Sequence, residues 1–319
     1  MIMITQDINR VIKILENQGV IGLPTETVYG LGGSLFSDKA IREIYSIKNR
    51  PFENPLIVHI SNKDRIVELV TLIPDEIQVL INAFSPGPIT FLLPKNHKVS
   101  SLVTAGKSNV AIRIPSHPLA QELLTKLDFP LVAPSANPFQ RVSPVTAQQV
   151  ENYFSNEKLV VLDGGLASCG IESTIVGYEK GKVVLFREGY ITLKKIENVL
   201  NDSIINKTKR KEIEAPGMYK RHYAPSCPLI IAQDIEKEVL RWKNKKIGVL
   251  LLESKTDDEK DCFVISLSKK GNTKEALSNL YNALHILENQ KIDIIITHLF
   301  PNDEYGSIIN ERLLKASYK

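Results

Sequence analysis

Apolar residues along the first two hundred positions follow two periods. From Ile8 to Asn17 they recur at helical spacing, and Gly19 ends that helix; a second stripe covers residues 38–48 and stops before Pro51. Further helices are expected at residues 118–127, 147–154 and 193–200. Short apolar runs indicate buried strands at residues 20–23, 56–60, 90–93, 110–114, 131–133, 159–162, 174–176 and 183–186. The pattern predicts an α/β domain with a mixed sheet.

The composition changes after about residue 202 to a lysine- and arginine-rich stretch, followed by Pro, Gly and aromatic residues up to Pro228. Beyond it, strand patterns at residues 229–232, 247–252, 263–267 and 292–297 alternate with helical patterns at residues 235–243, 273–289 and 307–315. This alternation predicts a small parallel, Rossmann-like sheet. The expected organisation is a catalytic domain over residues 1–205, a linker over 206–228 and a C-terminal domain over 229–319.

The formal charge is +4 and the pI about 8.7, which suits an acidic ligand such as a nucleotide and falls short of a dedicated nucleic-acid binder. The three cysteines are odd in number and far apart, so their spacing predicts neither a disulfide framework nor a zinc site. No apolar run approaches the ~18 residues that span a bilayer. A cytoplasmic protein without membrane contact is expected.

The segment Leu23–Gly33 places two threonine hydroxyls and a carboxylate directly after a strand, followed by glycines. Ligand sites in α/β folds form at strand ends, where glycine lets the backbone approach a ligand. A polar turn with packing glycines gives the same pattern. Both interpretations remain open.

Lys48 and Arg50 end a helix, where cations already complement the helix dipole. Pro51, Asn54 and Pro55 restrain the loop that follows, and a restrained Lys/Arg pair is suited to a triphosphate. His59, inside the next apolar strand, is ordinarily a hydrogen-bonded core histidine.

Arg113 lies in a strand whose apolar neighbours imply burial, and a buried guanidinium needs an anionic partner. That partner is either a structural Asp or Glu, or a substrate carboxylate that fits its fork.

Several later loops carry small polar groups that also have ordinary explanations. Ser135 follows a strand, Ser143 or Thr146 could cap a helix, Ser173 lies in a loop, and Arg187 could be a surface charge. We find no Ser-His-Asp or Cys-His signature and no transition-metal spacing. Hydroxyls and guanidinium groups favour catalysis by positioning and charge neutralisation, as nucleotidyl transfer needs.

In this order along the chain, the segments resemble the YrdC-like family of threonylcarbamoyl-AMP synthases, in its long form with an additional C-terminal domain. The resemblance rests on Pro24–Gly32, Lys48–Pro51, Asn54–Leu56, Pro86–Pro88, Val110–Arg113, Ala133–Asn137, Gly170–Thr174, Phe186–Gly189 and His222–Pro225. It implies a YrdC-like twisted mixed sheet, followed by the small Rossmann-like domain.

The resemblance also implies roles for individual residues. L-Threonine would contact Thr27, His59, Arg113, the backbone near Ala133, and Ser173, with Arg113 facing the carboxylate. ATP would contact Lys48, Arg50, Asn54, Asn109, Ser135, Ser143 and Arg187, with Tyr223 of the linker closing over the site. Asn109 departs from the hydroxyl residue that is common at its position.

The implied reaction joins L-threonine and CO2 from bicarbonate into a carbamate, which attacks the α-phosphorus of ATP and expels pyrophosphate. Lys48 and Arg50, with Mg²⁺ accompanying ATP, would stabilise the leaving group as the catalytic cations. The product would serve a tRNA modification next to the anticodon, with transient contact to the downstream transferase machinery or tRNA.

Two other functions fit parts of the sequence. The first is an RNA-binding module whose cations contact phosphates, although no aromatic reading platform accompanies them. The second is a regulatory protein that senses a small ligand through its C-terminal sheet.

Overall fold

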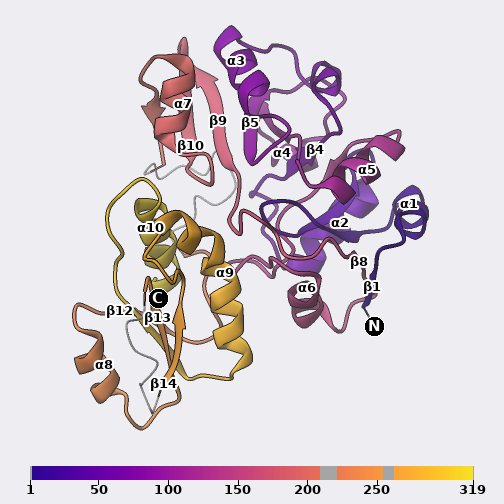
Figure 1. The fold of residues 1–319 in the computed structure, drawn as a ribbon. Helices are drawn as coiled ribbons and strands as arrows, with labels where there is room; N and C mark the ends of the chain where they lie inside the picture. Colours follow the sequence, from indigo (N-terminus) through magenta and orange to yellow (C-terminus); the bar gives the residue numbers. More distant parts are fainter. Residues whose placement is uncertain (1, 209–220, 254–261, 319) are drawn as a thin grey trace. The chain divides into compact units, whose positions relative to one another are not determined.

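The structure is a computed structural model that describes residues 2–208, 221–253 and 262–318 (Figure 1). The chain forms two compact units. The first contains residues 1–139 and 145–218, and the second contains residues 140–144 and 219–319. The expected boundaries at residues 205 and 229 stay a prediction, and residues 209–220 of the expected linker lie outside the described residues.

The first unit is built on one mixed sheet with the strand order β1-β8-β2-β3-β7-β4-β6-β5-β9-β10-β11. Its strands are β1 (Met3–Thr5), β2 (Ile21–Leu23), β3 (Gly30–Ser34), β4 (Ile57–His59), β5 (Ile89–Pro94), β6 (Asn109–Arg113), β7 (Leu131–Val132), β8 (Val160–Leu162), β9 (Thr174–Glu179), β10 (Lys182–Arg187) and β11 (Ile205–Asn206). Parallel pairs such as β4–β6 and antiparallel pairs such as β5–β6 occur side by side. The predicted mixed α/β sheet is confirmed.

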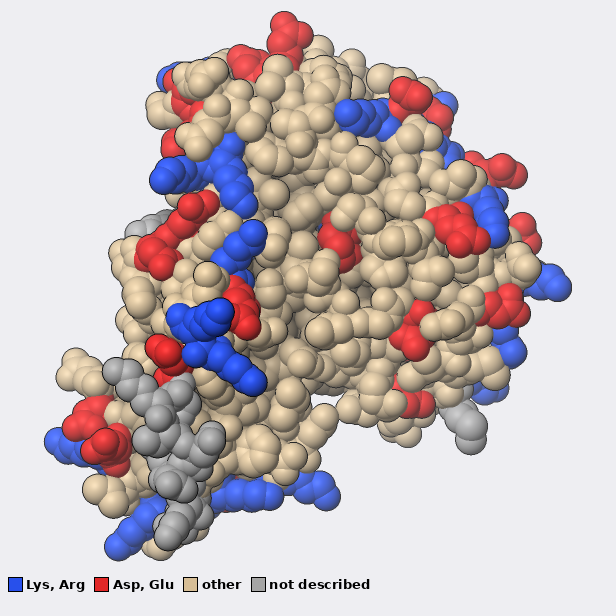
Figure 2. Space-filling model, in the orientation of Figure 1, with Lys and Arg blue, Asp and Glu red and all other residues tan. Residues whose placement is uncertain are grey.

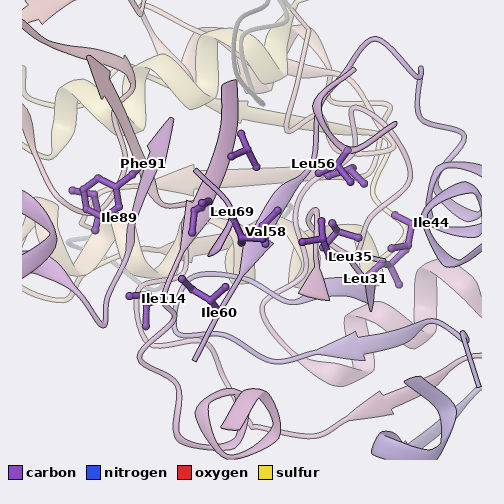
Figure 3. Packing of buried hydrophobic residues seen from close by; sticks show 14 of the residues in the cluster. Leu31, Leu35, Ile44, Leu56, Val58, Ile60, Leu69, Ile89, Phe91 and Ile114 are labelled. Atoms are coloured by element: carbon purple, nitrogen blue, oxygen red, sulfur yellow. The ribbon is translucent and has the colours of Figure 1, made fainter. Parts of the chain in front are cut away.

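Helices pack on this sheet through the apolar stripes that the sequence carries. They are α1 (Ile8–Glu16), α2 (Asp38–Lys48), the 3-10 turn η1 (Lys63–Glu68), α3 (Asp75–Phe84), α4 (Ser101–Thr104), α5 (Pro118–Lys126), α6 (Ala147–Phe154) and α7 (Leu193–Leu200). Side chains of α2, α3, α4, α6 and α7 share one core with the sheet, part of which Figure 3 shows. Helices α1 and α5 share a second core with strands β2, β7 and β8.

A third cluster of buried side chains consists of strand residues alone. Its members are Ile57, Leu92, Ala111, Ile175, Val184 and Phe186. Because side chains alternate across a sheet, residues two positions away from these lie on the same face. This face therefore receives Thr90, His59 and Arg113, and it positions the candidate site.

The second unit contains a four-stranded sheet of order β12-β15-β13-β14, in which every pairing is parallel. Its strands are β12 (Leu229–Ile231), β13 (Ile247–Leu251), β14 (Cys262–Ser266) and β15 (Ile294–Thr297), and its helices are α8 (Ile235–Arg241), α9 (Thr273–Asn289) and α10 (Gly306–Ser317). The predicted small parallel sheet is confirmed.

Residues 24–33 do not form one continuous turn, because Gly30–Ser34 form strand β3, which pairs with β2. The glycines serve close packing here. A Cβ on Gly33 would lie 3.0 Å from Cβ of Ala40 on α2, and one on Gly30 would lie 3.1 Å from Cβ of Ala133. Glycine in a strand often marks such an approach.

Among the described residues, no helix is both long and apolar enough to cross a membrane.

Candidate active site

The strand pair β4–β6 places two of the predicted threonine contacts together. His59 lies directly opposite Arg113 in the parallel register, and both side chains are almost fully buried. Because side chains alternate along a strand, they lie on the same face of the sheet as Ile57 and Ala111. Two polar side chains on one buried face form the centre of a polar site.

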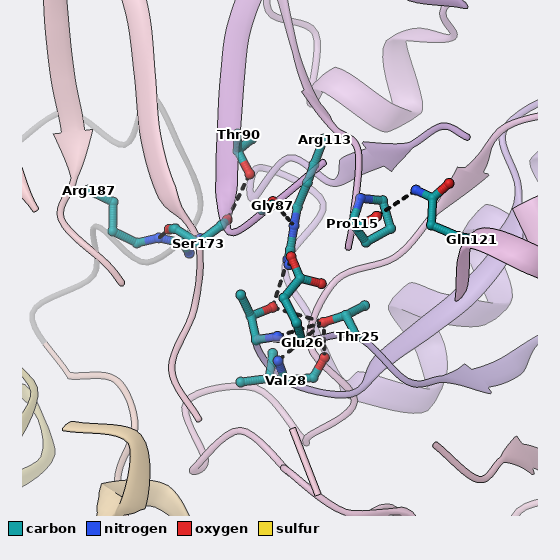
Figure 4. A network of polar contacts seen from close by, with 11 residues as sticks. Thr25, Glu26, Val28, Gly87, Thr90, Arg113, Pro115, Gln121, Ser173 and Arg187 are labelled. Atoms are coloured by element: carbon teal, nitrogen blue, oxygen red, sulfur yellow. Dashed lines mark hydrogen bonds and ion pairs between the residues drawn. The ribbon is translucent and has the colours of Figure 1, made fainter. Parts of the chain in front are cut away.

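Arg113 is held by groups from two segments of the chain (Figure 4). Its Nη1 donates to the hydroxyl of Thr27 at 2.7 Å, and its Nε donates to the carbonyl of Gly87 at 3.4 Å. Its Nη2 lies 2.7 Å from Oε1 of Glu26. Of the two partners left open by the sequence, the structure thus contains the structural carboxylate.

The loop that carries Glu26 and Thr27 is fixed by its own hydroxyls. Thr25 Oγ1 donates to the carbonyl of Val28 at 2.6 Å and lies 2.9 Å from Thr27 Oγ1. Tyr29 also anchors the loop, because its hydroxyl donates to the carbonyl of Gly165 and accepts from the backbone N–H of Gly164. Burial raises the pKa of Tyr29 to about 12, so this hydroxyl stays protonated.

His59 is neutral in this environment. Burial, with the positive charge of Arg113 as a second cause, lowers the pKa of His59 to about 3. Its Nδ1 lies 3.2 Å from the carbonyl of Ile57. A neutral imidazole adds no positive charge beside Arg113 and offers hydrogen bonds.

A hydroxyl chain connects the sheet to Arg187. The hydroxyls of Thr90 and Ser173 lie 2.7 Å apart, and Arg187 donates to both the hydroxyl and the carbonyl of Ser173, at 3.1 and 3.0 Å. A register shift in β10 lies between Leu185 and Arg187 and re-aims this side chain. The structure thus joins Ser173, a predicted threonine contact, to Arg187, a predicted ATP contact.

Lys48 is 1% exposed, unlike a surface cation that only complements the helix dipole. Its Nζ donates to the carbonyls of Ser135 and Asn137. Burial, followed by repulsion from Arg50, holds the pKa of Lys48 well below its usual range. An anionic ligand beside this ammonium would favour its charged form.

The loop after α2 arranges Arg50 and Asn54. Arg50 donates through Nε to the carbonyl of Asn54 at 3.1 Å and through Nη2 to that of Pro55 at 2.8 Å. The side-chain amide of Asn54 is fully buried, and neither its oxygen nor its nitrogen has a hydrogen-bond partner among the described residues. A buried amide of this kind fits a ligand that supplies the partner.

The loop 133–137 is hydrogen-bonded to the strand ends around it. The backbone N–H of Ala133 donates to the carbonyl of Ile57, and that of Ala136 donates to the carbonyl of Tyr29. An isolated bridge pairs Gly30 with Ser135. These bonds fix the two carbonyls that face Lys48.

The β4–β6 register separates the predicted contacts into two groups. Extending it toward the strands' N-terminal ends brings Pro55, next to Asn54, opposite Asn109, while His59 and Arg113 lie at the other end. Four residues of strand span ~13 Å. The predicted ATP contacts Asn54 and Asn109 therefore lie at one end, and the predicted threonine contacts His59 and Arg113 lie at the other.

Two predicted ATP contacts belong to the second unit. The carbonyl of Ser143 lies 3.1 Å from Nε2 of His285 on α9. Tyr223 is buried, with its ring stacked on Tyr281 at 5.7 Å and the guanidinium of Arg312 4.8 Å from its centroid. Their roles toward ATP, and the lid role of Tyr223, stay predictions.

Two site residues were given no role from the sequence. Glu26 is the carboxylate between Thr25 and Thr27 in the segment after the first strand, so the sequence indicates its position. Thr90 begins a predicted strand, and only the pairing of β5 with β9, which places Ile89 opposite Thr174, brings it to Ser173.

Family models match both units of the chain. The model described as "Telomere recombination" (Sua5_yciO_yrdC) matches residues 13–189, and the model described as "Threonylcarbamoyl-AMP synthase, C-terminal domain" (Sua5_C) matches residues 191–317. The chain belongs to the Sua5/YciO/YrdC family. The second match places it among the members with the additional C-terminal domain, as the sequence resemblance predicted.

Relatives of this family match the chain almost from end to end. A Bacillus subtilis (strain 168) protein named threonylcarbamoyl-AMP synthase is 35% identical over 95% of this chain and 91% of its own length. A Pyrococcus abyssi (strain GE5 / Orsay) protein of the same name is 34% identical over 93% of this chain and 90% of its own length.

A solved structure of Sua5 from P. abyssi, complexed with L-threonine, is similar to this chain in fold. Its TM-score is 0.88 at 30% identity, over 99% of this chain and 97% of that one. The Sua5-type arrangement of a mixed sheet with a separate parallel sheet therefore extends over the whole chain.

Proposed function

We propose that this chain is a threonylcarbamoyl-AMP synthase that forms threonylcarbamoyl-AMP and pyrophosphate from L-threonine, bicarbonate-derived CO2 and ATP. The proposal is carried by the buried polar side chains His59, Thr90 and Arg113 on β4, β5 and β6, within a chain that matches named synthases over more than nine tenths of its length. The reaction makes it an adenylyl-transferring enzyme.

The threonine part of the site is the end of the sheet that contains His59 and Arg113. The threonine carboxylate binds the guanidinium fork of Arg113, whose orientation Thr27 fixes through its hydroxyl. His59, the backbone near Ala133, and the hydroxyl of Ser173 complete the contacts. His59 is neutral and therefore adds no positive charge beside Arg113.

The nucleotide part of the site is the region around Lys48, Arg50 and Asn54, to which Asn109, Ser135, Ser143, Arg187 and Tyr223 are added by the family resemblance. Lys48 and Arg50 neutralise the phosphates, and the buried amide of Asn54 supplies hydrogen bonds to the nucleotide. ATP enters as its Mg²⁺ complex, with the metal ion as part of the substrate.

The chemistry needs positioned reactants more than a protein nucleophile. The threonine ammonium loses one proton to give the amine, which attacks CO2, and the nitrogen then loses a second proton to solvent to give the carbamate. A carbamate oxygen attacks the α-phosphorus of ATP. The bond from the α-phosphorus to the bridging oxygen breaks, and pyrophosphate leaves with its charge stabilised by Lys48, Arg50 and Mg²⁺. The product serves tRNA modification, and its transfer involves transient contact with the downstream machinery or tRNA.

Pyrophosphate release from Mg-ATP by the purified chain tests this function. We expect release only when L-threonine and bicarbonate are both present, together with a product of the mass of threonylcarbamoyl-AMP. Arg113→Ala should abolish the threonine-dependent pyrophosphate release. The control is Arg65→Ala on η1, at a position outside the predicted contacts. The proposal would be refuted if pyrophosphate release did not depend on threonine, or if ATP stayed intact under every condition.

A further inference from the structure

Glu26 and Arg113 form a buried pair whose hydrogen-bonding capacity is partly unused. Glu26 is 5% exposed and Arg113 is 4% exposed, and Glu26 Oε1 lies 2.7 Å from Arg113 Nη2. Within residues 2–208, 221–253 and 262–318, neither oxygen of Glu26 accepts a hydrogen bond, and Arg113 Nη2 donates none. The two charged groups thus lie within ion-pair distance but are not aligned as hydrogen-bond donor and acceptor.

Such a pair is costly for a structure to keep. Desolvating two charges offsets much of their attraction unless hydrogen bonds satisfy their remaining donors and acceptors. Buried polar atoms without partners are rare in folded proteins and are typical of sites where another molecule provides the partner. The unused positions here are acceptors on a carboxylate and a donor on a guanidinium, side by side.

A free α-amino acid carries the two complementary groups on one carbon atom. Its ammonium is a donor of three hydrogen bonds, and its carboxylate accepts the bidentate bonds that guanidinium favours. The charges of Glu26 and Arg113 sum to zero, and His59 is neutral. Binding of a zwitterion, whose own net charge is zero, therefore leaves the net charge of these three side chains and the ligand at zero.

We propose that Glu26 binds the ammonium group of the amino-acid substrate while Arg113 binds its carboxylate, so that the ion pair opens and each partner exchanges the other for one end of the zwitterion. This inference rests on the proposed function, because it assigns the substrate-binding end of the same site. It adds a specificity-determining residue to the threonine contacts that the resemblance implies.

The exchange discriminates against molecules that carry one charge instead of two. The hydroxy-acid analogue of threonine, 2,3-dihydroxybutyrate, has the carboxylate but no ammonium, so it would take Arg113 away from Glu26 and leave a buried carboxylate unpaired. An unpaired buried charge is strongly unfavourable. Glu26 therefore makes the site reject anions that Arg113 alone would accept.

Calorimetric titration without ATP or bicarbonate tests the proposal on the full chain. The ligands are L-threonine and the matching stereoisomer of 2,3-dihydroxybutyrate, and the proteins are the wild type, Glu26→Gln, Glu26→Asp and the surface control Glu122→Gln. A hydrogen bond to a charged group is worth about 10- to 100-fold in affinity. We expect Glu26→Gln to lose this factor for threonine and to bind dihydroxybutyrate as well as or better than the wild type. Glu26→Asp should recover part of the preference.

Two results would overturn the proposal. The first is an equal loss of affinity for both ligands in Glu26→Gln, which would mean that Glu26 only orients Arg113. The second is equal affinity of the wild-type protein for the two ligands, which would mean that the site does not recognise the ammonium group. This measurement needs no variant and therefore no assumption about folding. A chain that shows the expected preference yet releases no pyrophosphate would refute the synthase proposal and leave this one standing.

Discussion

His59 and Arg113 lie directly opposite each other in the parallel strands β4 and β6, and burial, together with the charge of Arg113, keeps the imidazole neutral. The pKa of His59 is about 3 in the folded chain and about 6.5 in an unfolded one. Between these values the unfolded state binds a proton that the folded state does not. Stability is therefore lost as the pH falls through this window.

The first prediction concerns His59→Gln, which removes this titration. Because of His59, the free energy of unfolding is expected to be about 2 kcal/mol lower at pH 5 than at pH 7, at about 1.36 kcal/mol per pH unit below the pKa of the unfolded state. We expect the thermal midpoint of the wild type to fall by about 5 °C more than that of His59→Gln between pH 7 and pH 5. Scanning calorimetry measures both midpoints. Equal drops would show that His59 is protonated in the folded state.

The second prediction concerns proton uptake by Lys48. Burial, followed by repulsion from Arg50, lowers the pKa of Lys48, and a bound triphosphate would raise that pKa again. We expect ATP binding at pH 8 to take up protons and to tighten as the pH falls. Titration calorimetry in two buffers of different ionisation enthalpy measures the uptake. Lys48→Met should abolish it, whereas Lys39→Met, an exposed change on the same helix, should leave it intact.

The third prediction separates binding from stability at two asparagines. Asn54→Ala removes an amide that has no hydrogen-bond partner among the described residues, so we expect a small change in thermal midpoint and a roughly tenfold loss of ATP affinity. Asn96→Ala is the control, because the Asn96 amide donates to the carbonyl of Glu68 at 2.8 Å. It should lower the midpoint without changing ATP affinity. The reverse pattern would exclude Asn54 from the nucleotide site.

The fourth prediction concerns the anchor of the binding loop. Tyr29→Phe removes the hydroxyl that accepts from Gly164 and donates to Gly165, and it leaves a backbone N–H without its partner. We expect a loss of about 1–3 kcal/mol, measured as the shift of the chemical unfolding midpoint. The exposed Tyr318→Phe should unfold like the wild type. An unchanged midpoint in Tyr29→Phe would mean that the loop is held in another way.

The regular elements of the fold were predictable where local signals agreed. Helices 147–154, 193–200 and 273–289 were predicted with the observed bounds, and each has an N-cap residue whose side chain accepts from the first turn. Helix α3 was not predicted, although Pro74 and the acidic first turn precede Ile77, Leu80 and Ile81 at helical spacing. That signal was present and could have found it.

Other elements depend on partners distant in the chain. Strand β1 has three residues and pairs with β8, more than 150 positions away. Strand β3 is rich in glycine, and the close approach of Ala133 to Gly30 and of Ala40 on α2 to Gly33 explains why glycine is needed. Local propensity carries no information on either.

The candidate site was predictable as a set of residues but not as an arrangement. Burial of Arg113 followed from its strand, whereas its pairing with Glu26 joins positions 87 apart. The sequence had left a structural carboxylate open as the partner without choosing between Asp and Glu. The roles toward threonine and ATP still rest on the family resemblance.

The five residues 140–144 belong to the second unit while the chain on both sides of them belongs to the first. Within the second unit, the carbonyl of Gln140 accepts from Ala224 and Arg141 pairs with Glu288 at 2.6 Å. The polypeptide therefore crosses between the units three times. No single cut divides this protein into two complete modules. A gene fusion or truncation near residue 218 would separate residues 140–144 from the rest of the second unit.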